Sequence, residues 1–479
     1  LERLRADKGN DPEFEKMLGE GYFFMGDIQG SPIQASLGDL AGSFAWYRKA
    51  LAILAPLADQ HPSNSRYQLD LCDALERIAV AFQHSGKDRE ALEYNQKHLD
   101  ASRRAAALAP DDPRAVAQIG YATRDLGLLL GASDPGRAEP YTREGLEVFQ
   151  RLVKRDPENP DFLDNTAQLL NQLATIASSR HELKQAADHI RQGADIRERL
   201  LKLKPDDTQR QRGLWLSYAR LGDILAGAFE SLGDTQGAIG YYRKSMALAN
   251  EMLAKDPTSK TAQSDLANLK VRLGSVLSSD DQRQESLALL SEALASLDAG
   301  LAASPKNALL RFSAANVLSL MAVRLRSADP VRALECARRA IAHLTAPGVP
   351  ASAEFQGRIA VTRQLTAVLL AEADDRSGAL EQSRQARNAY ERQAGSASPG
   401  AQGTGPRYWR YAGEMYYVLA RKKEASPDQR LADWRAARDA YGRSAAEWRQ
   451  SLATRRQAEL AQLEPKIAEC EAAIASAAR

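Results

Sequence analysis

Prolines that would end helices recur at a nearly constant interval, and this period limits what the chain can fold into. Successive members of the series lie about 48 residues apart: Pro62, Pro110, Pro157, Pro205, Pro257 and Pro305. Between them Ala and Leu dominate, and apolar positions follow one another at the spacing of a helix face. The chain is therefore expected to be an array of repeated helical units rather than a few separate globular domains.

Two columns of mostly small residues keep a fixed register ahead of these six prolines, and the series continues in two further units. The first column contains Ser43, Ala91, Ala138, Ala186, Ala238 and Ser286, and continues with Ala333 and Ala379. The second column contains Ala50, His98, Gly145, Gly193, Ser245, Ala293, Ala340 and Ala386. Members of a pair are about two helical turns apart and share one helix face, so we expect a neighbouring helix to approach closely there.

Two segments resemble the tetratricopeptide repeat, a helix pair of about 34 residues. They are AFQHSGKDREALEYNQKHL (81–99) and AFESLGDTQGAIGYYRKSM (228–246), in which Phe82 and Phe229 would fill the gap between paired helices. A longer period of about 48 residues implies that each helix has gained about two turns and reaches about 30 Å. The resemblance implies an all-α, right-handed α-α superhelix of about nine elongated helix pairs with a C-terminal capping helix.

The pattern divides the chain into four expected parts. Residues 1–62 form the first unit and residues 63–350 the regular repeats, while residues 351–456 hold divergent repeats. Residues 457–479 form a closing helix, whose alternating charges would supply the polar cap that the end of such an array needs. The segment SASPGAQGTGP, ahead of the last aromatic-rich repeat, is expected to be a linker or loop.

The first unit contains the pair Gly-Asp twice, at Gly26 and at Gly38. Counting forward from Tyr22 places the turn glycine of the repeat at Gly26, whereas counting back from Ser43 places it at Gly38. This disagreement predicts an insertion of about 12 residues that forms a surface loop, which either packs over the first helix pair or contacts a ligand. The loop lacks the residues of a phosphate-binding or calcium-binding loop.

The first 55 or so residues, which begin LERLRADKGNDPEFEKMLGEGYFFMGD, resemble the repeat-bearing C-terminal region of bacterial serine/threonine protein kinases of the acidobacteria type. The resemblance implies that the chain is a fragment whose missing N-terminal part carries the kinase domain. The chain itself has no kinase signature, so no phosphoryl transfer is expected from it. This part would be extracytoplasmic if a membrane helix precedes it, and otherwise cytoplasmic.

Composition and spacing disfavour several other classes of function. Lys and Arg number 64 and Asp and Glu 62, so the net charge of +2 gives no general attraction to nucleic acid. Cys72, Cys336 and Cys470 are too widely spaced for a zinc motif, and no apolar run reaches the roughly 18 residues of a membrane span. His181 and His189 lack the spacing of a metal motif, and no cofactor or catalytic group is expected.

The polar positions on the first helix of each unit are where a partner would be held, because these helices line the concave side of a helix-pair array. The candidate residues are Gln168, Asn171, Thr175, Arg220, Asp223, Asn268 and Ser275. They predict a polar, mostly uncharged groove without a Lys, Arg and Asn cluster for a C-terminal carboxylate. The expected function is a non-catalytic scaffold that binds a protein or peptide; the alternative is a small-ligand sensing domain that regulates an attached kinase.

Aromatic and basic residues gather between residues 407 and 456. Trp434, Tyr441 and Trp448 are spaced by about two helical turns and share a face. They either pack under the closing helix or bind an acidic segment or nucleic acid, and their spacing favours packing.

Overall fold

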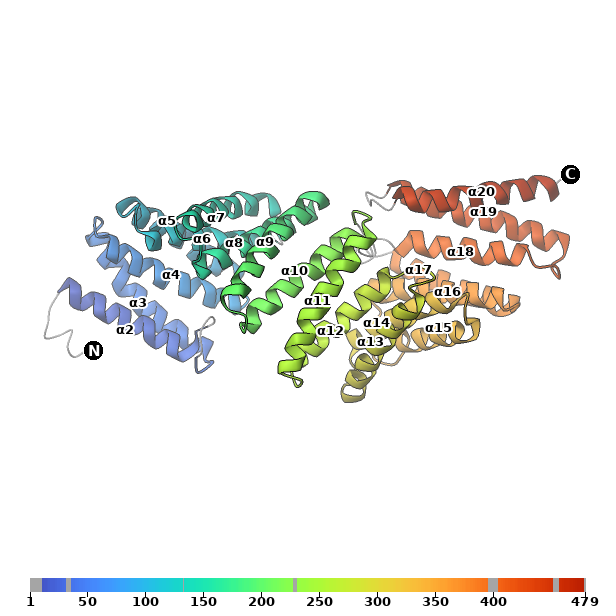
Figure 1. The fold of residues 1–479 in the computed structure, drawn as a ribbon, viewed down its shortest axis with the longest axis horizontal. Coiled ribbons are helices and arrows are strands. Elements are labelled where there is room, and N and C mark those ends of the chain that lie inside the picture. The colour runs from blue at the N-terminus through green and yellow to red at the C-terminus, as the bar shows by residue number, and fades with distance from the viewer. Residues whose placement is uncertain are drawn as a thin grey trace. The chain divides into compact units, whose positions relative to one another are not determined.

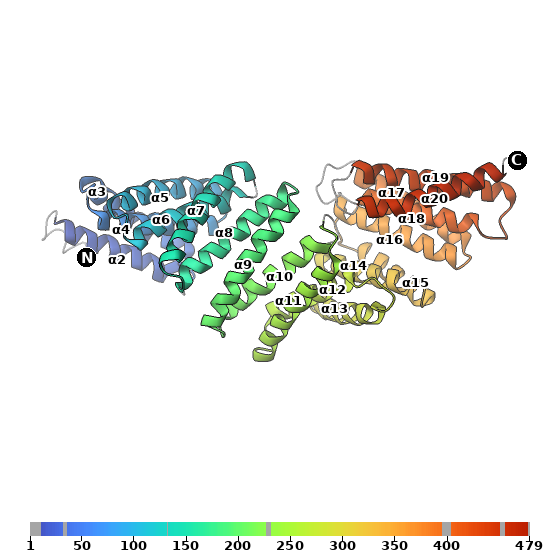
Figure 2. The same cartoon turned by 45° about the horizontal axis from the view of Figure 1, so that its top comes forward.

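The computed structural model describes residues 11–31, 36–131, 133–226, 231–394, 404–450 and 456–477, which form helices and turns with no strand among them. The chain divides into two compact units: Leu1–Ser217, called unit 1 here, and Tyr218–Arg479, called unit 2. Helix α10 (Thr208–Ala226) begins in unit 1 and ends in unit 2. Within each unit, successive helices pack side by side (Figures 1 and 2).

Unit 1 is built from helix pairs in which the two helices are joined by a turn. Its complete helices are α2 (Pro12–Gly30), α3 (Leu40–Gln60), α4 (Ser65–His84), α5 (Asp88–Leu108), α6 (Pro113–Gly131), α7 (Pro135–Arg155), α8 (Pro160–Ser179) and α9 (Leu183–Leu203). In each pair the even-numbered helix comes first, and we call it the first helix.

Unit 2 continues the same alternation of first and second helices. Its helices after α10 are α11 (Thr235–Lys255), α12 (Lys260–Val276), α13 (Arg283–Ala303), α14 (Ala308–Leu325), α15 (Pro330–Leu344), α16 (Ala353–Glu372), α17 (Arg376–Ala394), α18 (Thr404–Ala420), α19 (Pro427–Gln450) and α20 (Arg456–Ala477). The predicted fold class is confirmed, since the described helices α2 to α19 make nine pairs and α20 closes the array.

The predicted helix ends follow from local chemistry. Each proline of the period lies just beyond the end of a second helix, as Pro110 does after α5 and Pro257 after α11. Proline has no N–H and cannot extend a helix by donating to it. The next first helix then starts at a capping side chain, as Asn64 does by accepting from the backbone of Arg66 and Tyr67.

The two small-residue columns face neighbouring helices, as the sequence predicts. Every residue of the first column is fully buried, and every residue of the second column is buried as well. His98 is the one large member, and its Nε2 lies 2.8 Å from the Oε1 atom of Gln118 on the next first helix. The buried columns and the closing prolines together make this a tetratricopeptide-like solenoid.

The aromatic residue expected between paired helices is confirmed at Phe82. Its ring lies 4.7 Å from that of Phe44 and 5.3 Å from that of Tyr94, and the side chain is buried. Phe229, predicted for the same role, lies outside the described residues.

The predicted loop around Gly26 is wrong, because α2 continues as a helix to Gly30. Gly26 is a packing position: a Cβ atom there would lie 2.5 Å from the ring of Tyr47. The Tyr47 hydroxyl donates to Asp27 at 2.8 Å, which holds α2 against α3. The turn glycine is Gly38, whose φ of +80° lies in the left-handed region that glycine adopts without strain. Residues 32–35 of the predicted insertion lie outside the described part of the chain.

The predicted packing of the aromatic stripe near the C-terminus is confirmed. Tyr441 and Trp448 are buried in a cluster with Leu463 and Cys470 of α20, and Trp434 packs at its edge. Several basic residues of this region stack on its aromatic rings, as Arg443 does over Trp409 at 4.5 Å. Residues 396–403 of the predicted linker lie outside the described residues, and its last three residues, 404–406, are instead the first turn of α18.

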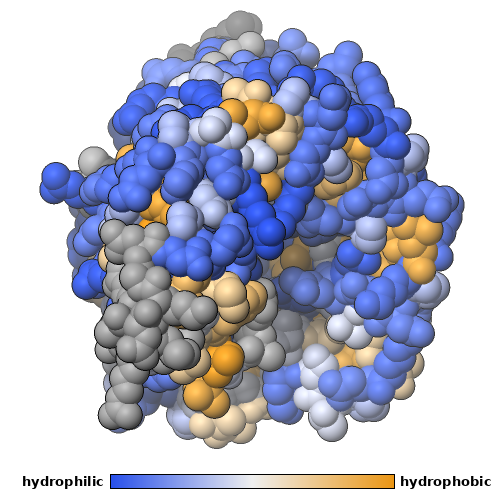
Figure 3. Space-filling view, turned by 90° about the vertical axis from the view of Figure 1, so that its left-hand side faces the viewer, coloured by the Kyte–Doolittle hydropathy of each residue, from blue (hydrophilic) through white to orange (hydrophobic). Residues whose placement is uncertain are grey.

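The two ends of the described chain differ in the apolar surface that they expose. Helix α2 exposes Met17, Phe24, Met25 and Ile28, and Figure 3, which views the side where α2 lies, shows hydrophobic patches among hydrophilic surface. No large hydrophobic residue is exposed on the described part of α20. The closing helix therefore gives the array a polar end.

Two helices, α13 and α14, are long and apolar enough to cross a membrane by length and composition alone. In this structure α14 packs against α13 and α15 and contributes Ala314, Leu318 and Met321 to the core of unit 2. Core helices of soluble proteins pass the same test, so the finding is weak evidence for a membrane span.

Candidate functional site

The first helices of unit 2 line a cavity with a volume of about 680 Å³, which we call the unit 2 cavity. Its walls come from the C-terminal half of α10 and from α12, α14, α16 and α18, with Trp448 of α19 and Glu459 of α20 at its edge. Its charged lining residues are Asp223, Arg272, Arg324, Arg358, Arg407, Arg410 and Glu459. This volume is within the range of small-molecule sites, about 300–1,000 Å³.

Two of the seven predicted partner-binding residues, Asp223 and Ser275, line this cavity. Asp223 accepts a hydrogen bond of 2.8 Å from the Tyr242 hydroxyl and pairs with Arg272 at 3.2 Å. Burial raises the pKa of Asp223, and the nearby guanidinium of Arg272 opposes that rise. The backbone carbonyl of Ser275 accepts a bond of 2.8 Å from Arg324.

The three predicted residues of unit 1 lie on α8 and are engaged within the fold. Gln168 donates to Asp164 at 2.8 Å, and the Thr175 hydroxyl donates to the Asn171 carbonyl at 3.0 Å. With its amide oriented so that the oxygen faces the guanidinium, Asn171 accepts from Arg197 at 2.8 Å. These contacts tie α8 to itself and to α9.

The remaining two predicted residues do not line the cavity. Arg220 is half-buried on α10, where burial lowers its pKa and Asp223 opposes that shift. Asn268 is exposed on α12. The seven candidates thus fall into separate places, and the structure brings together only Asp223 and Ser275.

The predicted uncharged groove is wrong for unit 2, because five arginines line the cavity. The prediction considered first helices only as far as α12, whereas most of these arginines lie on α14, α16 and α18. The sequence shows an arginine on each of these first helices, but not in one register: Arg272 and Arg324 lie 14 and 9 residues ahead of Ser286 and Ala333. Spacing alone therefore does not place them on one surface, and the stacking of the helices decides it.

The arginines of the cavity differ in how they are paired. Arg410 contacts Glu414 at 3.2 Å and Glu459 at 3.1 Å. Arg324 instead donates to the Ser275 carbonyl and, at 3.3 Å, to the Ser286 hydroxyl. Arg358 lies over the Phe312 ring, 5.4 Å from its centre. Among the described residues, neither Arg324 nor Arg358 has a carboxylate within ion-pair distance.

Burial acts on both of these arginines. It lowers the pKa of Arg324, and burial together with the nearby Arg407 lowers the pKa of Arg358 to about 10. A guanidinium is protonated at neutral pH, so both side chains carry a charge whose desolvation is not offset by a carboxylate within ion-pair distance; at Arg358 the more distant Glu354 opposes the shift only in part.

The first helices of unit 1 carry a buried ion-pair network instead. Arg77 pairs with Asp27 at 3.3 Å and with Glu76 at 3.6 Å. Arg124 pairs with Asp125 at 2.7 Å and with Glu76 at 3.9 Å. The network joins α2, α4 and α6, so its charges are used to hold neighbouring first helices together.

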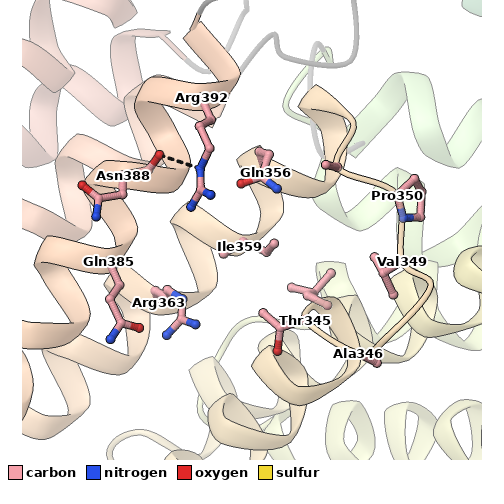
Figure 4. Close-up of a pocket in the computed structure, with 12 residues that line it drawn as sticks. Thr345, Ala346, Val349, Pro350, Gln356, Ile359, Arg363, Gln385, Asn388 and Arg392 are labelled. Atoms are coloured by element: carbon pink, nitrogen blue, oxygen red, sulfur yellow. Dashed lines mark hydrogen bonds between the residues drawn. The ribbon is translucent and has the colours of Figure 1, made fainter.

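A second, smaller cavity of unit 2 lies beside the connection between α15 and α16 and has a volume of about 310 Å³. Figure 4 shows Gln356, Ile359 and Arg363 on one helix and Gln385, Asn388 and Arg392 on the next. Its two arginines have local acceptors: Arg363 donates to Gln382 at 2.8 Å and Arg392 to the Asn388 carbonyl at 3.0 Å. Both arginines of this cavity are thus hydrogen-bonded within the fold, so it is a weaker candidate for binding an anion than the unit 2 cavity.

The described residues contain no group of three or more His, Cys, Asp and Glu side chains that could hold a metal ion. His181 occupies the turn between α8 and α9, where its φ of 63° corresponds to the position that glycine takes at Gly86. His189 lies on α9, and burial lowers its pKa.

No family model matches this sequence, and no curated protein matches it as a relative. Solved structures that overlap with it include a Signal Transduction ATPase with Numerous Domains protein with a tetratricopeptide repeat sensor, PH0952 from Pyrococcus horikoshii (TM-score 0.48, 11% identity, 80% of this chain and 53% of that one). The apo form of RapI overlaps with a TM-score of 0.46 at 12% identity, over 82% of this chain and 90% of that one. BtubC from P. vanneervenii overlaps with a TM-score of 0.40 at 16% identity, over 56% of this chain and 94% of that one. Such overlap does not transfer a function.

Proposed function

We propose that this chain is a non-catalytic protein-interaction scaffold, and that its unit 2 cavity holds an extended segment of a partner protein. The observation that supports the proposal is the origin of the lining: residues of successive first helices, from α10 to α18, face one continuous cavity. In solenoids of helix pairs this concave side is the extended surface available for binding.

The lining of the cavity suits a peptide because it mixes apolar and hydrogen-bonding groups. Leu320, Val323 and Val361 offer apolar contact, while Ser319 and Thr362, whose hydroxyls lie 3.3 Å apart, can donate or accept. An extended segment needs both, since its side chains alternate in direction and its backbone groups must be satisfied.

The test uses a matched pair of Val to Trp substitutions in the full-length chain. Peptides are selected against the wild-type chain by phage display, and their affinities are measured by fluorescence anisotropy. Val323→Trp introduces a bulky ring at the edge of the cavity, where the valine is 37% exposed. Val331→Trp is the control, because Val331 is 71% exposed on α15 and does not line the cavity.

We expect Val323→Trp to weaken the selected peptides by about tenfold or more, because the ring occupies space that the peptide needs. Val331→Trp should change their affinity by less than about twofold. Equal affinity for both variants would show that the peptides bind elsewhere and would overturn the proposed site.

The alternative function is a domain that senses a small ligand. It is favoured by the position of Trp448 and Glu459, which come from the last two helices and enclose one edge of the cavity. A small ligand that binds the folded chain raises its melting temperature by mass action. A thermal-shift screen that finds such a ligand, in a chain that selects no peptide, would replace the scaffold proposal with this one.

We further propose that the scaffold is the repeat region of a larger bacterial serine/threonine kinase. The support is the resemblance of the first 55 or so residues to such regions. Sequencing the gene upstream of Leu1 tests the proposal: an open reading frame encoding a kinase domain supports it, and any other domain there contradicts it.

A further inference from the structure

The unit 2 cavity has an excess of positive charge. Five arginines line it, against the two carboxylates of Asp223 and Glu459. Both carboxylates are already engaged, Asp223 by Arg272 at 3.2 Å and Glu459 by Arg410 at 3.1 Å. Arg324 and Arg358, in contrast, have no carboxylate within ion-pair distance among the described residues.

The cost of these two charges is visible in their surroundings. Both side chains are only partly exposed, and burial lowers the pKa of each, with Arg407 adding repulsion at Arg358. An anion placed in the cavity would relieve this cost, because it supplies the charge that the fold omits.

A second, independent feature of the lining is an unused hydrogen-bond donor. Trp448 is 9% exposed, and its Nε1–H has no partner among the described residues. Buried indole N–H groups normally find an acceptor. Trp448 lines the same cavity as the arginines, so an acceptor bound there could satisfy it.

We propose that the unit 2 cavity binds a phosphoryl group, held by Arg324 and Arg358. The inference names the chemistry of the occupant, and it rests on the proposal that this cavity is a binding site. A phosphate monoester carries a charge of about −1.5 to −2 near neutral pH and three acceptor oxygens, which matches two cations and further donors. Guanidinium groups bind phosphate through two parallel N–H bonds.

The cavity is also larger than a phosphoryl group requires. Its volume of about 680 Å³ leaves room for the molecule or residue that carries the group. Two sources share this chemistry: a small phosphorylated metabolite and a phosphorylated side chain of a partner protein.

The experiment measures binding to the full-length chain by isothermal titration calorimetry at constant ionic strength. The probes are inorganic pyrophosphate, a phosphoserine peptide, the same peptide with serine, and the same peptide with glutamate. The variants are Arg324→Gln and Arg358→Gln. Arg384→Gln is the control, because Arg384 is exposed on α17 and paired with Glu381 at 2.8 Å.

We expect at least one phosphorylated probe to bind the wild type and the Arg384→Gln variant equally. Each cavity variant should lose about ten- to hundredfold in affinity, because one charge-assisted interaction is removed. Binding of pyrophosphate alone assigns the site to a small metabolite, and binding of the phosphoserine peptide alone assigns it to a phosphorylated partner.

Three results would overturn the inference: no phosphorylated probe binds the wild type at millimolar concentration, the cavity variants bind as well as the control, or both peptides bind and the glutamate peptide does so as tightly as the phosphoserine peptide. Arg324 also contacts Ser275 and Ser286 within the fold, so the variants of Arg358 decide the test: Arg358→Lys keeps the charge and should retain part of the affinity that Arg358→Gln loses. The peptides selected for the scaffold test need no phosphate, so the scaffold can survive the failure of this inference.

Discussion

The first helices of unit 1 pair their buried charges with one another. Unit 2 also contains ion pairs between helices, as Arg326 makes with Glu372 at 2.7 Å, but two further arginines of its first helices face a cavity without a carboxylate within ion-pair distance. In unit 1, Arg77 and Arg124 each contact two carboxylates, among Asp27, Glu76 and Asp125. In unit 2, Arg324 and Arg358 contact carbonyl, hydroxyl and aromatic groups instead. Buried arginines of unit 1 therefore hold neighbouring first helices together, whereas Arg324 and Arg358 of unit 2 leave charge for a ligand.

This difference has an energetic meaning. A buried ion pair that loses one member leaves an uncompensated charge, so it is costly to break even where it adds little net stability. A cation that has no carboxylate partner in the free protein lowers the stability of the fold through its desolvation. An anionic ligand that pairs with this cation offsets the desolvation, which favours binding. Substitution of Arg124 in unit 1 and of Arg358 in unit 2 should therefore have unequal effects.

The largest effect is expected for Arg124→Met in unit 1. The substitution leaves Asp125 buried without its cation and Glu76 with Arg77 alone, and it should lower the free energy of unfolding of unit 1 by about 3–5 kcal/mol. Hydrogen exchange of the α6 amides in the full-length chain measures it. Arg114→Met on the same helix is the control: Arg114 is 63% exposed in its pair with Asp73, so its loss should cost less than about 1 kcal/mol. Equal costs would mean that the network is not buried in solution.

The next effect concerns the contact that both units share between a glycine and a tyrosine. A Cβ atom would lie 2.5 Å from the Tyr47 ring at Gly26 and 2.4 Å from the Tyr242 ring at Gly222. Gly26→Ala and Gly222→Ala should each cost about 1–3 kcal/mol in urea unfolding, because the ring must move.

The control for this pair is Gly240→Ala within α11, where no atom lies within 4 Å of the new Cβ. It should stabilise the chain by about 0.5–1 kcal/mol, since alanine favours the helix. Stabilisation by Gly26→Ala as well would show that α2 and α3 can separate without loss.

A smaller effect distinguishes the units by pH. Burial, with the nearby Asp125 second, raises the pKa of Glu76 from 4.5 to about 7. The folded state then holds this proton more tightly than the unfolded state, so unit 1 should lose stability as pH rises from about 4.5 to 7, by up to about 1 kcal/mol per pH unit. Asp70, with its pKa raised to about 6 by burial, acts in the same direction. Glu76→Gln should reduce the slope measured by hydrogen exchange, and an unchanged slope would exclude Glu76 as its source.

The smallest effect is expected for Arg358→Met in unit 2, the counterpart of the first substitution. Removal of an uncompensated cation saves its desolvation cost but loses the contact with Phe312, so the free energy of unfolding should change by less than about 1 kcal/mol. A loss as large as that of Arg124→Met would mean that the two units do not differ in the proposed way.

Much of the fold could be predicted because its signals are local or strictly periodic. Pro110 and Pro257 each follow the end of a helix, because proline cannot continue it. The buried Ala91 and Ala238 take the same place in their repeats. Gly26 was assigned to a turn because it obeys the same count as Gly86. The structure places it in a helix instead, since the ring of Tyr47, from the following helix, requires a residue without a side chain.

The candidate site was predicted less well. The repeat register predicts Asp223 and Ser275 as candidates, because it fixes the face of the helix on which a residue lies. Asn171 satisfies the same rule, yet it faces Arg197 of the paired helix. The position of a residue in the repeat does not predict whether its polar side chain bonds to a neighbouring helix or faces a cavity.

The sequence by itself determined the repeat, the length of the helices and the residues on which they pack, because helix ends and close approach depend on proline and on small side chains at fixed spacing. Only the tertiary structure decided which arginines meet carboxylates and which face a cavity. Arg124 finds an acceptor on α8 and a carboxylate on α4, whereas Arg358 finds Phe312 and the repulsion of Arg407. Such partners lie about one repeat away along the chain, and they meet only when the helices stack.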